Sequence, residues 1–385
     1  MSVGIETFGG YQNAAQAFGV GGLANQTAET KDNAQRVVDY INKHGGLAGR
    51  KIVPVYHDTN IDSSETWDND EQATCAAFTE DHHVFAALTP EGFDYDTLVK
   101  CLAARNTILL RSSVNLYDQQ FADQFPGLYY QPGDVFGNRW SAFIDSLLRQ
   151  GYFQKGSRVG IIRATWPEEA RTVQMMRRQL AAHGLQVVDE IAEEDETSTA
   201  GVGNTLAGMS NAVLRFRSDR VDHVIFTQGP VFELGFMTNA ESQQYRPAYA
   251  LTSRFNLSFI QSNVPAAQLR TSAGVTFAGL PGHPLDNAAT RLCKSPHIGP
   301  SNLSDGNPYC NKLFFLQAVL GRAPTLSIRG FVAGVKALGT SFVSSGALAT
   351  NFGTHYQDGG AAGRPFHWDS SCSCFNYAGN VFTVP

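Results

Sequence analysis

The sequence lacks any apolar run long enough to cross a bilayer, and it lacks an excess of positive charge. A spanning helix needs about 20 consecutive apolar residues, and no stretch approaches that length. The 29 Lys and Arg residues are outnumbered by 35 Asp and Glu residues, which gives a net charge of −6. Because no basic surface is available to neutralise phosphates, we do not expect nucleic acid as a partner.

Catalytic signatures are also missing. No P-loop, G-x-S-x-G elbow, G-x-G-x-x-G or H-E-x-x-H occurs where its mechanism would require it. Cys372-x-Cys374 with His367 suggests a metal ligand set, but the spacing is not that of a zinc ribbon and no second cysteine pair lies nearby in sequence. We therefore expect a protein that is not an enzyme and that holds neither a metal nor a cofactor.

The first eight residues lack the basic and apolar regions of a secretory signal. Two explanations stay open: a cytosolic protein, or an extracytoplasmic one whose targeting segment precedes this sequence. The six cysteines, an even number, favour the second, because paired cysteines persist mainly in oxidising compartments. We expect a periplasmic or cell-surface protein, with a lipid anchor as one option.

With 385 residues the chain is long enough for two or three domains. Short β-rich runs alternate with helical patterns almost throughout, which is typical of parallel βαβ units and predicts the α/β class. The first series has expected strands at 3–7, 52–56, 84–88 and 107–110. A helix between the first two strands carries an apolar stripe and ends at Gly45-Gly46.

A second series follows the break at Pro132-Gly133. It contains expected strands at 158–163, 186–191 and 223–227, and expected helices at 135–150, 204–217, 232–245 and from Pro167 onward. Residues 278–308 are rich in Gly, Pro, Asn and Ser and predict a long surface loop. Helices at 311–320 and 328–338 and closing strands at 373–377 and 381–384 complete the pattern.

One continuous segment carries a family resemblance. It reads Asp39-Tyr40-Ile41-Asn42-Lys43-His44-Gly45-Gly46-Leu47-Ala48-Gly49-Arg50-Lys51-Ile52, followed by Val53-Pro54-Val55-Tyr56-His57-Asp58. This segment closely resembles the leucine/isoleucine/valine-binding protein family. Trp368-Asp369 and Cys372-Ser373-Cys374-Phe375-Asn376-Tyr377 resemble an actinobacterial-type branch of that family. The resemblance implies the type I periplasmic binding protein fold, in which two Rossmann-like lobes with parallel sheets are joined by a three-segment hinge. The expected N-terminal lobe comprises 1–131 and 254–369, and the C-terminal lobe 132–253 and 370–385.

The function implied by this resemblance is that of an extracytoplasmic solute-binding protein of an ABC importer. Such a protein closes its hinge on a small polar or carboxylated ligand: a branched-chain or other amino acid, or an aromatic or aliphatic acid. The implied partner is a membrane permease, and we expect a monomer. Alternatives are the ligand-sensing module of a signalling system and, less favoured, an α/β enzyme.

Ligands of open α/β sheets bind at the carboxyl ends of the strands. Carrying the family's binding positions across gives clusters at four strand ends, and aromatic or amide side chains of the first turn, a crossover and the second lobe would form walls. The candidate residues are Tyr11, Gln12, Thr89, Glu91, Gly92, Arg111, Ser112, Ser113, Gln131, Trp166, Gln228, Gly229, Ser253 and Arg254.

Several of these residues have an alternative role. Trp166 precedes Pro167, so stapling the start of a helix is an equally good role for it. Arg111 has a surface carboxylate as an equally good partner, and Thr89 and Ser112 are also suited to capping the helices that follow them.

Ser253-Arg254 departs from the family pattern, because relatives that hold an α-amino group have an acidic residue there. With Arg111, this favours a carboxylated ligand, since guanidinium groups suit carboxylates. Glu91 remains an acidic partner for an amino group, so both ligand classes stay open.

The cysteines allow fifteen pairings. We expect Cys75 to pair with Cys101 on successive helices, and Cys293 with Cys310 around the predicted loop. In an extended strand, the Cα atoms of Cys372 and Cys374 would be separated by nearly the largest distance that a disulfide can bridge. A disulfide and two free thiols therefore both stay open for this pair.

Overall fold

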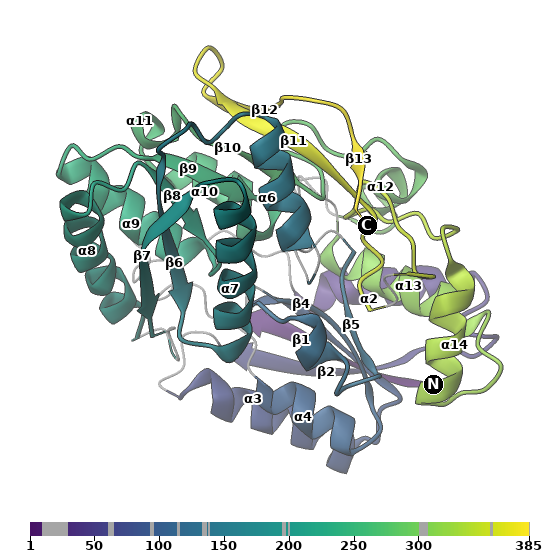
Figure 1. Cartoon of the computed structure of the whole chain (residues 1–385). Helices are drawn as coiled ribbons and strands as arrows, with labels where there is room; N and C mark the ends of the chain where they lie inside the picture. The colour runs from purple at the N-terminus through teal and green to yellow at the C-terminus, as the bar shows by residue number, and fades with distance from the viewer. Residues whose placement is uncertain are drawn as a thin grey trace.

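The computed structural model describes residues 1–9, 30–60, 65–92, 96–113, 116–132, 137, 139–194, 198, 201–299, 307–354 and 357–384. They form two sheets covered by helices (Figure 1). The first sheet has the strand order β2-β1-β3-β4-β5, and the second has the order β12-β11-β10-β9-β8-β6-β7, with β13 paired to β11. The α/β class with two lobes, expected from the sequence, is confirmed. No helix of the described ranges is long and apolar enough to cross a membrane.

The first lobe is built on a parallel sheet between two helical layers. Because successive strand residues point to opposite faces, Leu88 and Leu110 pack with α2, α13 and α14, whereas Ala87 and Leu109 pack with α3 and α4. The elements are β1 (Ser2–Gly9), α2 (Lys31–Lys43), β2 (Val53–Asn60), α3 (Trp67–Ala76), η2 (Ala77–Asp81), β3 (Ala86–Gly92), α4 (Asp96–Ala104), β4 (Ile108–Ser113), α5 (Gln119–Ala122), β5 (Leu128–Tyr130), α12 (Ala288–Cys293), α13 (Pro308–Leu320) and α14 (Ile328–Leu338).

Helix α2 shows how the segment that carries the family resemblance folds. The Thr30 side chain accepts a hydrogen bond from the Asn33 amide and caps the helix. At the other end the Gly46 amide donates to the Ile41 carbonyl. Gly46 has a φ of +67°, and a Cβ there would lie 2.2 Å from the Arg50 carbonyl oxygen, so only glycine fits this turn.

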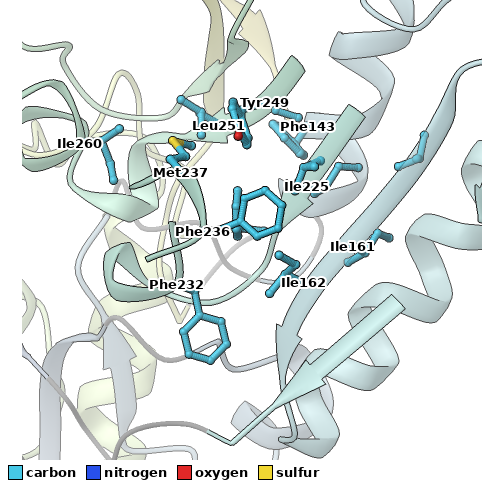
Figure 2. Packing of buried hydrophobic residues seen from close by; sticks show 14 of the residues in the cluster. Phe143, Ile161, Ile162, Ile225, Phe232, Phe236, Met237, Tyr249, Leu251 and Ile260 are labelled. Carbon is cyan, nitrogen blue, oxygen red and sulfur yellow. The ribbon is translucent and has the colours of Figure 1, made fainter. Parts of the chain in front are cut away.

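The second lobe has a larger, mixed sheet. Phe236 of α9 lies beside Ile225 of β8 and Ile162 of β6 in its core (Figure 2). The elements are α6 (Arg139–Arg149), β6 (Arg158–Ala164), α7 (Pro167–Ala182), β7 (Gln186–Glu193), α8 (Val202–Ser218), β8 (His223–Phe226), α9 (Pro230–Ser242), β9 (Ala248–Thr252), η4 (Ser253–Phe255), α10 (Leu257–Asn263), α11 (Ala266–Leu269), β10 (Ala273–Thr276), β11 (Ala362–Asp369), β12 (Cys374–Tyr377) and β13 (Phe382–Thr383).

The strand pairing divides the chain differently from the expected lobe boundaries. Residues 254–369 were expected in the first lobe, but β10 and β11 of that segment pair with each other, and β10 pairs with β9 of the second sheet. The helices α12 to α14 of that segment, and Phe352 after them, pack on the first lobe. Strand β11 contains Pro365, which removes a ladder donor and breaks the usual strand pattern. The predicted surface loop 278–308 contains α12.

Three disulfides join the six cysteines. Cys75–Cys101 links α3 to α4 with a Cα separation of 6.2 Å, and Cys293–Cys310 links α12 to α13 at 5.7 Å. Both predicted pairings are confirmed. Cys372–Cys374, which the sequence left open, is also a disulfide, with the two Cα atoms 5.2 Å apart.

Candidate functional site: the interlobe cleft

The two lobes meet through residues that follow strand ends. Tyr117 follows β4 of the first lobe, and Trp166 follows β6 of the second; their rings are in an edge-to-face contact with centroids 6.2 Å apart. Next to this contact, Arg171 of α7 forms an ion pair with Asp118 of the first lobe. The carboxyl ends of strands from both sheets therefore face one another, which is where an open α/β sheet binds its ligand.

Arg111 lies at this junction and is completely buried. Its guanidinium lies 4.9 Å from the centre of the Tyr117 ring, in a cation–π contact. Burial lowers the pKa of Arg111, but the Tyr117 and Tyr130 hydroxyls and the Glu71 carboxylate outweigh it, so the pKa is raised and the group stays charged. Arg111 is therefore not on the surface of its lobe, and whether a carboxylate of the chain or a ligand is its main partner stays a prediction.

Tyr130, the last residue of β5, connects the two lobes electrostatically. Burial raises the pKa of its hydroxyl well above the ordinary value, whereas Arg111 and Arg254 each lower it. Arg254 follows β9 of the second lobe and is itself buried. Two buried guanidinium groups from different lobes thus act on one phenol.

Thr89 lies at an irregularity in β3, where the pairing with β4 shifts register between Leu88 and Glu91. The shift frees the Thr89 carbonyl, which accepts a hydrogen bond of 2.5 Å from the ammonium of Lys312, a buried residue of α13. The Thr89 hydroxyl is buried and has no hydrogen-bond partner within the described ranges. It therefore does not cap a helix of the described chain, and it remains able to bond a ligand.

The neighbouring candidates follow the same two strands. Glu91 pairs with Ser112 and Gly92 with Ser113 across β3 and β4. Ser112 is buried, and the side chains of Glu91 and Ser113 lie outside the part that the structure describes.

The candidates of the second lobe lie at the ends of β8 and β9. Gln228 is buried, and Gly229 is the N-cap of α9. The Ser253 hydroxyl oxygen accepts from the Phe277 amide at 3.0 Å and so ties β9 to the chain after β10. The Ser253 hydroxyl therefore has a structural role. Arg254 is the charged residue of the pair and stays a candidate for contact with a ligand.

The remaining candidates form walls or fall outside the description. The Gln131 amide donates to the Arg111 carbonyl at 2.8 Å, which places Gln131 at the crossover beside β4. Trp166 is the N-cap residue of α7 but makes no side-chain capping bond, and its ring contacts Tyr117 instead. Tyr11 and Gln12 lie outside the described residues.

Each lobe also has a buried acidic residue that the sequence did not single out. The Glu6 carboxylate accepts from the Thr59 hydroxyl at 2.7 Å and from the Thr74 hydroxyl at 3.4 Å. Burial raises the pKa of Glu6 to about 7, although these bonds and Arg111 lower it. In the second lobe, Glu169 accepts from the Ala164 amide and the Thr227 hydroxyl, which fixes the ends of β6 and β8.

Some of these residues had a recognisable signal in the sequence. Lys312 is a lone lysine within the otherwise apolar helix α13, and Glu6 is a lone acid within the buried strand β1. Within the described ranges, no group of three or more His, Cys, Asp or Glu side chains is arranged to hold a metal ion.

Comparison with known proteins supports the fold. No protein-family model and no curated protein sequence matches this chain. Among solved structures, a fatty acid ABC transporter substrate-binding protein from Thermomonospora curvata has a TM-score of 0.64 at 15% identity, with 100% of this chain and 95% of that chain covered. A solute-binding protein from R. palustris in complex with 4-hydroxybenzoate has a TM-score of 0.66 at 11% identity, covering 100% and 98%.

A third structure, an ABC transporter substrate-binding protein from Desulfitobacterium hafniense in complex with Leu, has a TM-score of 0.63 at 12% identity, covering 98% and 99%. Identities this low establish shared architecture, not shared ligand. The chain therefore has the two-lobed fold of ABC transporter substrate-binding proteins of the leucine/isoleucine/valine-binding kind, as the resemblance in its sequence implied.

Proposed function

We propose that this protein is the extracytoplasmic solute-binding component of an ABC importer and that it binds a small carboxylated ligand between its lobes. The observation that carries the proposal is that Arg111 and Arg254, two buried cations from different lobes, both act on the hydroxyl of Tyr130. Guanidinium groups form strong, paired hydrogen bonds with carboxylates. A ligand carboxylate that contacted both groups would bridge the lobes.

The ligands named for three of the similar structures fit this chemistry. Leucine, 4-hydroxybenzoate and 3,4-dihydroxybenzoic acid all carry a carboxylate. Leucine also carries an ammonium, for which Glu91 is the candidate partner. The aromatic acids need no acidic partner, and Tyr117 and Trp166 offer aromatic surface at the lobe contact. The absence of an acidic residue at Ser253-Arg254 favours the acids over the amino acids.

Binding would act through hinge closure. A ligand that contacts both lobes stabilises the closed form by its differential affinity for the two states. Closure also removes water from the cleft, which strengthens the interaction of Arg111 and Arg254 with a bound anion.

Calorimetric titration with matched ligand pairs tests the ligand class. We expect 4-hydroxybenzoate or leucine to bind and the analogues that lack the carboxylate, methyl 4-hydroxybenzoate and leucinamide, to bind at least tenfold more weakly, because a charge-assisted hydrogen bond contributes about 1.5–3 kcal/mol. Arg254→Gln should weaken binding of the acid by a similar factor. The control, Arg291→Gln, removes an exposed cation paired with Asp286 and should leave affinity unchanged. Equal binding of acid and ester would rule out carboxylate recognition.

The wider parts of the proposal are a membrane permease as partner, an extracytoplasmic location and a monomeric, non-catalytic protein. Size-exclusion chromatography of the liganded protein checks that it is a monomer. Mass spectrometry of the released ligand checks that the protein does not alter it. A dimer, or a chemically altered ligand, would contradict them.

A further inference from the structure

The disulfide Cys372–Cys374 differs from the other two in position and size. It lies in the turn between β11 and β12, the hairpin at the edge of the second sheet (Figure 1). Cys372 is exposed, whereas Cys75, Cys293 and Cys310 are completely or almost completely buried. Cys374 and Cys101 are each half-buried, so Cys372–Cys374 is the one of the three described disulfides with an exposed cysteine, and Cys293–Cys310 is closed to solvent on both sides. Access is one of the factors that set the rate of exchange with a thiolate.

The ring that this disulfide closes contributes little to the fold. Its cysteines are separated by 2 positions in sequence, against 26 and 17 for the other two disulfides. On the chain-entropy account, a shorter loop removes less freedom from the unfolded chain. The residue inside the ring, Ser373, has a φ of +52°, a conformation that residues other than glycine seldom adopt. Opening the ring would let Ser373 relax and would leave the β11–β12 pairing in place.

A side chain is also oriented toward one of the two sulfurs. The Asn376 amide nitrogen donates to the Asp369 carboxylate at 2.9 Å and to Cys372 Sγ at 3.7 Å. Its amide oxygen lies 2.9 Å from His283 Nε2. The carboxylate can only accept, and hydrogen bonds from Ser371 and Asn376 hold the pKa of Asp369 below its ordinary value. These contacts fix the direction of the amide, so an N–H group points at Cys372.

We propose that Cys372–Cys374 is a reversible thiol–disulfide exchange site for a dithiol. One thiolate of the dithiol attacks Cys374 Sγ, which forms a mixed disulfide and breaks the Cys372–Cys374 bond. Cys372 leaves as a thiolate, accepts the Asn376 N–H and then takes a proton from solvent. The second thiol of the dithiol, once deprotonated, attacks the mixed disulfide and releases Cys374 as a thiolate. The dithiol becomes a disulfide, and the two electrons reside on the two cysteine thiols.

Selective reduction of the native, oxidised chain tests this proposal. The protein is incubated at pH 7 in buffers with a graded ratio of reduced to oxidised dithiothreitol, quenched with iodoacetamide and mapped by peptide mass spectrometry. We expect Cys372 and Cys374 to be labelled at ratios at which the other four cysteines stay unlabelled. Adding oxidised dithiothreitol before the quench should restore the disulfide. Labelling of all six cysteines in parallel, or labelling of Cys372 and Cys374 only after the other two pairs, would overturn the proposal.

The role of Asn376 is tested by rate. Asn376→Ala should slow reduction of this disulfide about fivefold, the equivalent of one ordinary hydrogen bond. Ser371→Ala is the matched control, because Ser371 also bonds to Asp369 but is not bonded to either sulfur in the described structure, and it should leave the rate unchanged. Equal rates in the two variants and the native chain would remove Asn376 from the mechanism.

Discussion

Arg171 of the second lobe and Asp118 of the first form a two-pronged ion pair across the interlobe cleft. Arg171 Nε lies 2.5 Å from one Asp118 oxygen, and Nη2 lies 3.0 Å from the other. Asp118 also caps α5 by accepting the Phe121 amide, and Glu168 holds Arg171 from the other side. Both partners are thus fixed before they meet, which lowers the entropic cost of the pair. The lobes are held together by a contact beside the candidate ligand groups.

Removing this contact should weaken ligand binding without touching the ligand. Arg171→Gln takes away a pair that forms only between the lobes, so the closed form loses stability relative to the open form. We expect the apparent Kd of a carboxylated ligand to rise about threefold to tenfold, corresponding to roughly 1 kcal/mol for a partly exposed ion pair. Calorimetric titration measures the change.

Arg246→Gln provides the control for that variant. Arg246 pairs with Glu241 entirely within the second lobe and is similarly exposed. Arg246→Gln should leave the affinity for the ligand unchanged. If both variants raise Kd equally, the effect of Arg171→Gln does not come from a weaker closed form.

The bond between Lys312 and Thr89 predicts a second effect. Lys312→Met keeps the volume of the side chain but removes the donor to the Thr89 carbonyl at the shifted part of β3. Because the carbonyl would be buried without this donor, we expect the free energy of unfolding to fall by about 2–3 kcal/mol. Urea denaturation measures the loss. The exposed Lys100, paired with Asp96, gives the control Lys100→Met, for which a change below about 0.5 kcal/mol is expected. Equal losses would contradict a specific role for Lys312.

The sequence predicted the repeated βαβ elements well, because their signals are local. The Thr30 cap, the apolar stripe of α2 and the Gly46 turn each follow from residues within a few positions of one another. Cys75–Cys101 also followed from its place on successive predicted helices, and Cys293–Cys310 from its place around the predicted loop.

What the sequence could not give was set by distant contacts. Strand β10 has four residues and includes Gly274, which must be glycine because a Cβ would lie 2.0 Å from the Leu251 carbonyl oxygen of β9. No local sequence pattern predicts such a short strand. The expected lobe boundary therefore assigned β10 to the first lobe, although it pairs with β9 of the second sheet. Likewise, Arg111 was recognised as a candidate, but its cation–π contact with Tyr117 and its approach to Tyr130 depend on how β4, β5 and the segment after β4 come together.

A buried ion pair in the crossover between the lobes predicts a large effect on stability. Arg139, at the start of α6, pairs with Asp358, and both are almost completely buried. The adjacent Gln357 bonds to the first lobe through the Ala122 carbonyl. Arg139→Met leaves the Asp358 charge buried without this partner, so we expect a loss of about 3–5 kcal/mol in thermal or urea unfolding. The double variant Arg139→Met with Asp358→Asn should recover part of that loss. If the double variant is no more stable than the single one, the unpaired charge is not the cause.

Glu6 makes stability depend on pH. Burial raises its pKa in the folded protein from the ordinary 4.5 to about 7. Between these values the unfolded chain has lost the proton and the folded chain has kept it, so unfolding releases a proton and stability falls as pH rises. At 1.36 kcal/mol per pH unit the loss across this window is about 3 kcal/mol, and above about pH 7 this residue adds no further slope.

Glu6→Gln should remove this slope, because an amide does not titrate and can still accept from the Thr59 hydroxyl. Urea unfolding is measured from about pH 3 to 8. The stability of the variant relative to the native chain should rise with pH up to about pH 7 and stay constant above it. Glu190→Gln is a control of opposite sign: burial raises the pKa of Glu190, but Arg163 and Arg177 outweigh it and hold the pKa below its ordinary value. That variant should be least stable relative to the native chain at neutral pH and should approach it as pH falls below about 4. For each variant, the difference in unfolding free energy from the native chain is plotted against pH. If the two plots slope in the same direction, burial of Glu6 in its protonated form is contradicted.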